Sequence, residues 1–231
     1  MRSLFELGDG DSYDPTRRRE RMVAEQIAHR GVLDEDVLRA MRSVPRHRFV
    51  PRDQVAQAHE DRPLAIGHGQ TISQPFIVAY MTAQLGLRRD SRVLEVGTGC
   101  GYQAAILARL AGEVHTVEIV PALARQASER LARLGFANVS VHAGDGAIGW
   151  PAAAPFDAII VSCGAPEIPP ALVAQLAPRG RLVCPVGRSH DKQDLVLVEK
   201  DERGRTKRWP TIAVRFVPLT GPSGSNLTGS S

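Results

Sequence analysis

The stretch Val93–Gly101, VLEVGTGCG, decides the fold because it joins an apolar strand to a glycine-rich turn. Its first residues are the β-branched and apolar side chains typical of a buried strand. Gly97, Gly99 and Gly101 allow a tight turn whose backbone lies close to a bound molecule. The segment that follows, QAAILARL at 103–110, consists mostly of strong helix formers. The pattern therefore predicts a strand, a turn and a helix around a ligand pocket.

The spacing of the glycines distinguishes two classes of cofactor. A dinucleotide site requires G-x-G-x-x-G, and its third glycine would stand at position 102, where the residue is Tyr102. The pattern present here, G-x-G-x-G led by Glu95, is that of S-adenosylmethionine (SAM) methyltransferases. An acidic residue there suits the sulfonium and amino-acid end of that cofactor. A tight turn that holds no ligand is the alternative.

The rest of the chain after residue 92 alternates apolar strands with helical segments. Further strands are predicted at 114–118, 139–142, 156–162 and 181–186, and helices at 121–134 and 171–176. This alternation predicts an α/β, doubly wound, mostly parallel sheet with helices on both faces. The last two strands, predicted at 195–199 and 214–219, form an antiparallel hairpin around a charged turn at 201–207.

A helical extension is predicted before this core. One helix begins near Arg17 and ends at Gly31, and a second follows Asp34 as its N-cap and stops at Pro45. The basic run from Arg17 to Arg21 forms a solvated face, with a nucleic-acid contact as the alternative. The expected organisation is a flexible arm at 1–15, a helical extension with the substrate loop at 16–90, a SAM-binding core at 91–220 and a disordered tail at 221–231.

The composition is ordinary for a soluble globular protein, with 43% hydrophobic and 23% charged residues and a net charge of +4. The charge permits nucleic-acid binding without arguing for it. Three separated cysteines with no C-x-x-C pair predict a reducing compartment and no metal site. The acidic N-terminus is no secretory signal, and no stretch reaches the ~18 apolar residues of a membrane helix. We therefore expect a cytoplasmic monomer without nucleic-acid or membrane partners.

A second unusual stretch, Ile66–Pro75 (IGHGQTISQP), precedes a predicted helix. Its glycines loosen the backbone, and its polar side chains are more numerous than a linker requires: His68, Gln70, Thr71, Ser73 and Gln74. Pro75 suits the first turn of the helix. Ser73 stands where an N-cap belongs, so satisfying a helix amide is its alternative role.

Acidic residues follow the next two strands of the core. In doubly wound sheets, ligands lie beyond the carboxyl ends of the strands. Glu118 ends its strand at a position suited to accept both ribose hydroxyls, with an exposed surface glutamate as the alternative. Asp145 can accept from an adenine amino group while the amide of Gly146 donates to the ring; an Asp-Gly turn is the alternative.

These motifs resemble the protein-L-isoaspartate O-methyltransferase family over nearly all of Met22–Leu219. The most specific segment is GHGQTISQP, and the glycine loop EVGTGCGYQ is shared with many methyltransferases. The other matching segments are MVAEQIAHRG, VPRHRFVP, FDAIIVS, EIPPALVAQL, GRLVCPVG and RFVPL. The resemblance implies a seven-stranded Rossmann-like sheet with an N-terminal helical extension, SAM as methyl donor, and L-isoaspartyl residues of damaged proteins as substrate.

The resemblance also implies the roles of individual residues. Ser73 is the implied catalytic residue, and the implied substrate contacts are His68, Gln70, Thr71 and Ser73. The implied cofactor contacts are Thr71, Ile72, Glu95, Gly97, Thr98, Gly99, Gly101, Glu118, Asp145, Gly146 and Thr220, the last matching only some family members. The chain departs from the family pattern at His59, where an aromatic residue is frequent, and at Ser162–Gly164, where small alanine-type residues are common.

The chemistry of that reaction needs no strong general base. An isoaspartyl linkage leaves a free α-carboxylate with a pKa of ~3.5, which is already ionised at neutral pH. Alignment and exclusion of water can supply ~7 to 11 kcal/mol. Ser73 is therefore expected to orient the carboxylate rather than to attack it.

Three other functions fit parts of the sequence. The first is a SAM-dependent methyltransferase that acts on another carboxylate or on a small molecule. The second is a non-catalytic binding protein that contacts nucleic acid through Arg17 to Arg21. The third, an NAD-dependent oxidoreductase, is disfavoured by Tyr102.

Overall fold

The computed structural model describes residues 13–189 and 192–221. Most of the arm expected at 1–15 and nearly all of the tail expected at 221–231 therefore lie outside the described residues.

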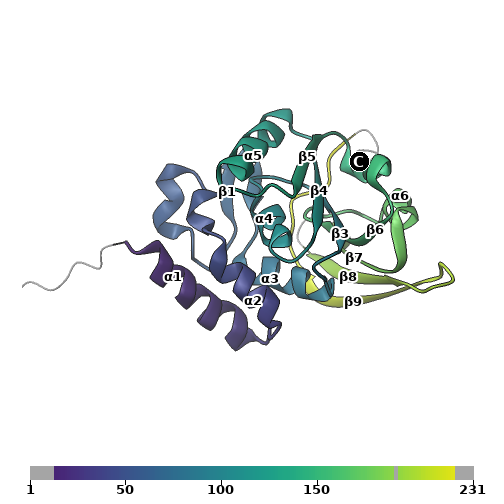
Figure 1. Cartoon of the computed structure of the whole chain (residues 1–231), viewed down its shortest axis with the longest axis horizontal. Helices are drawn as coiled ribbons and strands as arrows, with labels where there is room; N and C mark the ends of the chain where they lie inside the picture. The colour runs from purple at the N-terminus through teal and green to yellow at the C-terminus, as the bar shows by residue number, and fades with distance from the viewer. Residues whose placement is uncertain (1–12, 190–191, 222–231) are drawn as a thin grey trace, which may run out of the picture.

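A seven-stranded sheet forms the centre of the molecule and confirms the predicted doubly wound architecture (Figure 1). In spatial order the strands are β5 (Val139–Ala143), β4 (Glu113–Glu118), β3 (Arg92–Val96), β6 (Phe156–Val161), β7 (Leu176–Ser189), β8 (Lys192–Lys200) and β9 (Thr206–Val214). The first five are parallel to their neighbours, whereas β8 and β9 run antiparallel. The strand order reverses between β3 and β6, so a crevice for a ligand is expected at their carboxyl ends.

Helices cover both faces of this sheet. They are α3 (Pro75–Gln84), α4 (Tyr102–Ala108), α5 (Pro121–Arg133) and α6 (Pro170–Ala174), whereas α1 (Pro15–Arg21) and α2 (Glu35–Ser43) pack against other helices. Val93 packs in a cluster with Met81 of α3 and Leu107 of α4, whereas its neighbour Leu94 packs with Leu172 of α6. Adjacent residues of one strand point to opposite faces, and both are fully buried, which explains the continuous apolar run.

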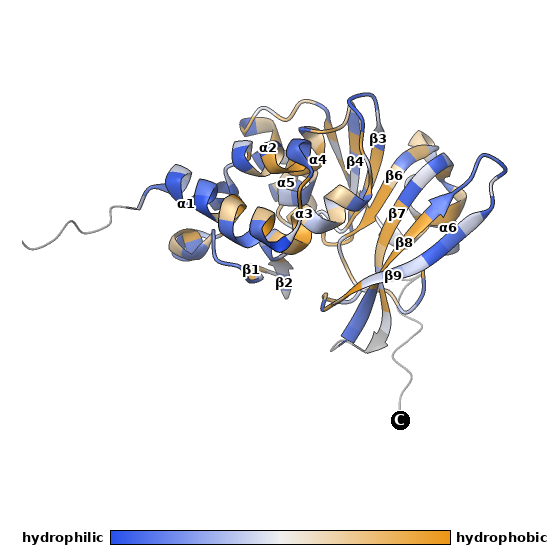
Figure 2. Cartoon of the chain, turned by 90° about the horizontal axis from the view of Figure 1, so that it is seen from below, coloured by the Kyte–Doolittle hydropathy of each residue, from blue (hydrophilic) through white to orange (hydrophobic). Residues whose placement is uncertain are grey.

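The hydropathy of the strands follows their position in the sheet. Figure 2 shows apolar residues along the central strand β6 and hydrophilic residues at the turn between β8 and β9. Among the described residues, no helix combines the length and apolar character needed to span a bilayer.

The N-terminal extension has the two predicted helices. Asp14 caps α1, which continues beyond Arg21 through a π-helical and a 3₁₀ turn until Gly31, at φ 93°, ends it. Asp34 accepts hydrogen bonds from two amides of α2, which confirms the predicted N-cap. Two further 3₁₀ turns, Arg46–Arg48 and Arg52–Gln57, lead to the next segment. Figure 1 shows α1 and α2 on the side of the molecule away from β8 and β9.

The IGHGQTISQP stretch contains a hairpin. Its strands are β1 (Leu64–Gly67) and β2 (Gln70–Ile72), which pair only with each other. The two turn residues, His68 and Gly69, have φ angles of 53° and 69°, and positive φ at both positions is what a type I′ hairpin turn requires. The glycine-rich sequence therefore builds a tight turn that places Ser73 just before α3.

The predicted strand at 214–219 is wrong. The last strand, β9, ends at Val214, and the turn before it is shorter than expected because the Asp201 carboxylate accepts from the amides of Arg203 and Arg205. The residues after Val214 leave β8 and run beside Gly164, whose amide donates to Val217 and whose carbonyl accepts from Leu219. We call residues 215–221 the C-terminal strap.

Candidate active site

The glycine turn is held by the strand next to it. One carboxylate oxygen of Glu118 accepts from the amide of Gly99 at 2.8 Å, and the other accepts from the amide of Val120 at 2.9 Å. Glu118 is 4% exposed, which rules out a free surface glutamate. Gly97 and Gly99 have φ angles of 90° and 53°, so the turn requires glycine at both positions.

Glu95 lies beneath the turn rather than in it. Its carboxyl group is fully buried and accepts from the Thr116 hydroxyl at 2.7 Å, which in turn lies 2.6 Å from the hydroxyl of Thr98. Burial, with a smaller contribution from the charge of Glu118, raises the pKa of Glu95 to about 8. Glu95 is therefore a protonated support of the turn in the free protein at neutral pH.

Two other glycines of the prediction allow close packing. Gly101 is the N-cap of α4 and lies against Leu131 of α5. A Cβ at Gly146 would overlap Cγ1 of Val96, at the end of β3. Gly146 is therefore needed where the loop after β5 approaches the glycine turn.

Asp145 forms the Asp-Gly turn that the sequence offered as the alternative to a contact with adenine. Its Oδ1 accepts from the amide of Ala147 at 2.9 Å and caps a short 3₁₀ turn. Gly221 of the strap lies directly over this carboxylate, since an added Cβ there would come 2.8 Å from Oδ1. The strap thus covers the position expected to bind adenine.

A narrow cavity lies above the glycine turn. Its volume is about 50 Å³, and residues of the turn, the neighbouring strand ends, β2 and the strap line it: Gln70, Thr71, Val96, Gly97, Gly99, Val117, Glu118, Ile119, Gly146, Ser162, Cys163, Val217, Pro218, Leu219 and Thr220. Burial raises the pKa of the Cys163 thiol, which makes it a neutral wall rather than a nucleophile.

A second cavity, of about 550 Å³, adjoins the first. Its lining comes from the Ser73 segment, α3, β8 and the strap: Pro63, Thr71, Ser73, Gln74, Ile77, Ser162, Lys192, Ala213, Val214, Arg215, Phe216 and Val217. Thr71, Ser162 and Val217 line both cavities. A molecule above the glycine turn and one beside Ser73 would meet at these three residues.

Ser73 does not have the capping role that was its alternative. The N-cap of α3 is Gln74, and no side chain caps that helix. The backbone carbonyl of Ser73 accepts from the guanidinium of Arg46 at 2.8 Å, so the residue is anchored through its main chain.

Six residues predicted to bind ligands line neither cavity: His68, Ile72, Glu95, Thr98, Gly101 and Asp145. His68 is exposed at the tip of the β1–β2 hairpin, and Ile72 is buried in the core of the extension. Glu95, Thr98 and Gly101 support the turn from below, and their contact with a cofactor stays a prediction.

The sequence alone missed Ile77, Lys192 and Arg215, which line the second cavity. They come from α3, β8 and the strap, and nothing in their local sequence marks them. Only the folded structure, in which three distant segments of the chain meet, reveals that these residues share a cavity.

The chemical groups that line the narrow cavity are of the types that SAM requires. A buried carboxylate, two glycines at positive φ and apolar side chains surround it. Cavities that bind small molecules usually have volumes above ~300 Å³, so this cavity is smaller than a site for a nucleotide-sized ligand, and the strap forms one of its walls.

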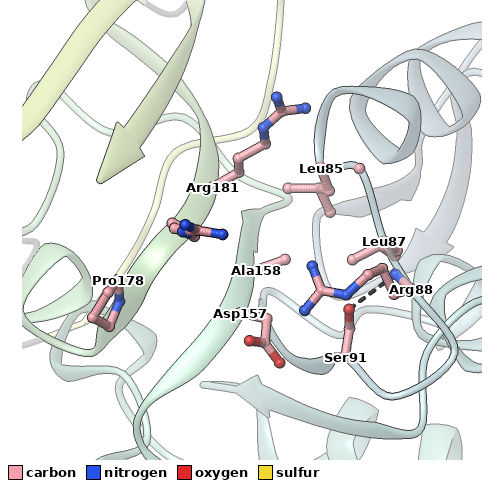
Figure 3. A pocket seen from close by; sticks show the side chains of 10 residues that line it. Leu85, Leu87, Arg88, Ser91, Asp157, Ala158, Pro178 and Arg181 are labelled. Atoms are coloured by element: carbon pink, nitrogen blue, oxygen red, sulfur yellow. Dashed lines mark hydrogen bonds between the residues drawn. The ribbon is translucent and has the colours of Figure 1, made fainter. Parts of the chain in front are cut away.

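Another cavity lies at the end of the sheet opposite the glycine turn (Figure 3). It measures about 690 Å³ and lies at the amino ends of β3 and β6. Its arginines already have acidic partners: Arg181 pairs with Glu199, and Arg88 with Asp90. Because ligands of parallel sheets lie at the carboxyl ends of strands, it is a separate surface feature.

Comparison with known proteins agrees with this geometry. The family model for protein-L-isoaspartate(D-aspartate) O-methyltransferase matches residues 17–224. The chain is 56% identical over 205 residues to the protein-L-isoaspartate O-methyltransferase of Opitutus terrae, covering 89% of this chain and 88% of the relative. It is 55% identical over 212 residues to that of Methanoculleus marisnigri, covering 91% and 96%.

Solved structures give the same result. A protein-L-isoaspartate O-methyltransferase matches with a TM-score of 0.81 and 30% identity, covering 89% of this chain and 67% of that one. A Plasmodium falciparum β-aspartate methyltransferase, solved with S-adenosyl-L-homocysteine, matches with a TM-score of 0.77 and 27% identity, covering 87% and 98%. The chain therefore belongs to the protein-L-isoaspartate(D-aspartate) O-methyltransferase family.

Proposed function

We propose that this chain transfers a methyl group from SAM to the free α-carboxylate of L-isoaspartyl residues in damaged proteins and peptides. The observation that carries the proposal is that the cavity beside Ser73 and the cavity above the glycine turn share Thr71, Ser162 and Val217. Donor and acceptor sites thus adjoin in a family member whose close relatives have this activity.

The cofactor would be held by Glu118 and by the backbone of the turn. Glu118 faces the cavity with a buried carboxylate suited to hydroxyl donors, and Gly97 and Gly99 permit close approach of the backbone. Asp145, Gly146 and Thr220 complete the far end of this site in the proposal. When bound, SAM supplies an electrophilic methyl group on a sulfonium.

The second cavity would hold the substrate carboxylate. Ser73 and Thr71 offer hydroxyl groups, while Lys192 and Arg215 give the rim basic side chains that attract an anion. Ile77 and Phe216 are apolar walls that keep water from the carboxylate. No general base is required because the carboxylate is ionised at neutral pH. The product ester would then cyclise to a succinimide, whose hydrolysis returns part of the chain to a normal aspartyl linkage.

The proposal also covers the roles of the two parts of the chain, its oligomeric state and its location in the cell. Residues 16–90 carry the substrate segment, and residues 91–220 carry the cofactor core. We take the protein as a monomer because one chain lines both cavities. We take it as acting in the cytoplasm because its cysteines are free thiols. No nucleic-acid partner is proposed, since Arg18 and Arg19 of the basic run bind backbone carbonyls of the extension itself.

The test is transfer of labelled methyl from SAM to an isoaspartyl peptide and to its aspartyl twin. We expect about a hundredfold or more preference for the isoaspartyl peptide, since only that peptide presents the free α-carboxylate at the modified residue. Equal labelling would point to a less selective carboxyl methyltransferase. Absence of labelling with retained SAM binding would leave a small-molecule acceptor or a binding protein.

A further inference from the structure

A buried arginine lies behind the Ser73 segment. Arg46 begins a 3₁₀ turn of the extension and is 0% exposed. Its Nε donates to the carbonyl of Ala58 at 2.7 Å, and its Nη2 donates to the carbonyl of Ser73 at 2.8 Å. The guanidinium also lies over the ring of Tyr102, 4.8 Å from the centroid. One rigid planar group therefore joins the extension, the core helix α4 and the segment before α3.

The charge of Arg46 has no bonded counterion. Within residues 13–189 and 192–221, no carboxylate forms an ion pair with it, and its Nη1 is buried without a hydrogen-bond partner. Burial lowers the pKa of this guanidinium. The ordinary pKa of arginine is so high that the group nevertheless stays protonated. Taking a charge out of water costs several kcal/mol, so Arg46 is an expensive way to hold two carbonyls if stability is its only role.

Neighbouring contacts hold the next residues of the same segment. Gln74 donates from Nε2 to Oδ2 of Asp61 at 2.8 Å, and Arg30 donates to the same oxygen at 2.6 Å. The guanidinium of Arg30 also lies 3.7 Å from the ring centroid of Phe76. The extension therefore holds the chain at three successive places around the start of α3, and Arg46 holds the residue that lines the substrate cavity.

We propose that Arg46 is a positioning residue for methyl transfer: it fixes the main chain of Ser73 so that the Ser73 hydroxyl meets the substrate carboxylate. This inference rests on the proposed function of Ser73. Two parallel donors on a planar fork hold the Ala58 and Ser73 carbonyls in one geometry, which a single ammonium group does not reproduce. The buried positive charge behind Ser73 also favours an anion in the adjoining cavity.

The experiment compares Arg46→Met and Arg46→Lys with wild type. The matched control is Arg48→Met, which removes an exposed arginine from the same 3₁₀ turn. Three quantities are measured: kcat and KM for an isoaspartyl peptide, affinity for SAM, and hydrogen exchange of the amides at 71–77. The exchange measurement needs neither cofactor nor substrate.

For Arg46→Met we expect kcat/KM for the peptide to fall about tenfold or more, with unchanged SAM affinity and about tenfold faster exchange at 71–77. Arg46→Lys should recover part of the activity, and Arg48→Met should match wild type. The proposal is overturned if folded Arg46→Met keeps wild-type peptide kinetics, or if peptide and SAM parameters worsen by the same factor.

If Arg46→Met does not fold, Arg46→Lys carries the test, and wild-type exchange together with wild-type kinetics in that variant would overturn the proposal. Failure of the proposed function is distinguishable, because wild type itself would then not prefer the isoaspartyl peptide. The exchange measurement would still report whether Arg46 holds the segment.

Discussion

The carboxylate of Glu118 accepts a hydrogen bond from the amide of Gly99, which ties the end of β4 to the glycine turn after β3. The carboxylate proposed to hold the ribose of SAM therefore also shapes the glycine turn. Replacing Glu118 by Ala removes the acceptor for two partly buried amides and for the proposed ribose hydroxyls. We expect SAM affinity to fall about tenfold or more by calorimetry. Glu167→Ala, at an exposed site, is the control, and wild-type affinity of Glu118→Ala would contradict this assignment.

Gly146 should not tolerate a side chain, because its Cβ would overlap Val96. We expect Gly146→Ala to lower the free energy of unfolding by roughly 1–3 kcal/mol and to weaken SAM binding, since Val96 lines the cavity. The control is Gly144→Ala, where the nearest atom to the added Cβ is 3.9 Å away. The additional change Val96→Ala should restore part of the loss. Equal urea midpoints for the two glycine variants would refute the overlap.

The buried Glu95 should make stability depend on pH. With a pKa of about 8 in the folded chain and an ordinary value of 4.5, the folded state keeps a proton that the unfolded state has released. Stability therefore falls as the pH rises through this window, by roughly 5 kcal/mol, and the loss is complete above it. In urea unfolding, the free energy of unfolding of Glu95→Gln should equal that of wild type near pH 4.5 and exceed it above pH 8. Glu129→Gln, at an exposed site, should show no such gain.

Ser73→Ala should separate catalysis from cofactor binding. The residue lines the second cavity and not the narrow one, and the cap it would provide for α3 is absent. We expect turnover of the isoaspartyl peptide to fall about a hundredfold with SAM affinity retained. Ser140→Ala on the exposed side of β5 serves as control. A collapse of SAM binding with normal turnover per bound cofactor would move Ser73 to the cofactor site.

The strap should be loosened by changing Gln193. Its buried amide donates to the carbonyl of Phe216 at 3.3 Å and accepts from the amide of Phe216 at 2.9 Å. Because the strap lines the narrow cavity, Gln193→Ala should speed both association and dissociation of SAM in stopped-flow experiments and weaken its affinity. The control is Gln126→Ala on the exposed side of α5. Unchanged rates would show that the strap does not control access.

The local elements were largely predictable from the sequence. The strands and helices after residue 92 follow from the local alternation of apolar runs and helix formers. The start of α2 follows from the capping residue Asp34. The strand predicted at 214–219 failed for a tertiary reason. Its backbone is hydrogen-bonded to Gly164 and to the Gln193 side chain rather than to β8, and composition does not distinguish the two environments.

The stretch Val93–Gly101 by itself determined a strand, a turn with positive φ and the start of a helix, because glycine spacing and apolar runs act locally. Tertiary structure alone decided that Ser73, Ser162 and the strap meet beside that turn. It also placed the Arg46 guanidinium behind Ser73, 27 residues away along the chain. Such contacts depend on how the extension packs on the sheet, and that packing is the sum of many buried contacts that no single motif records.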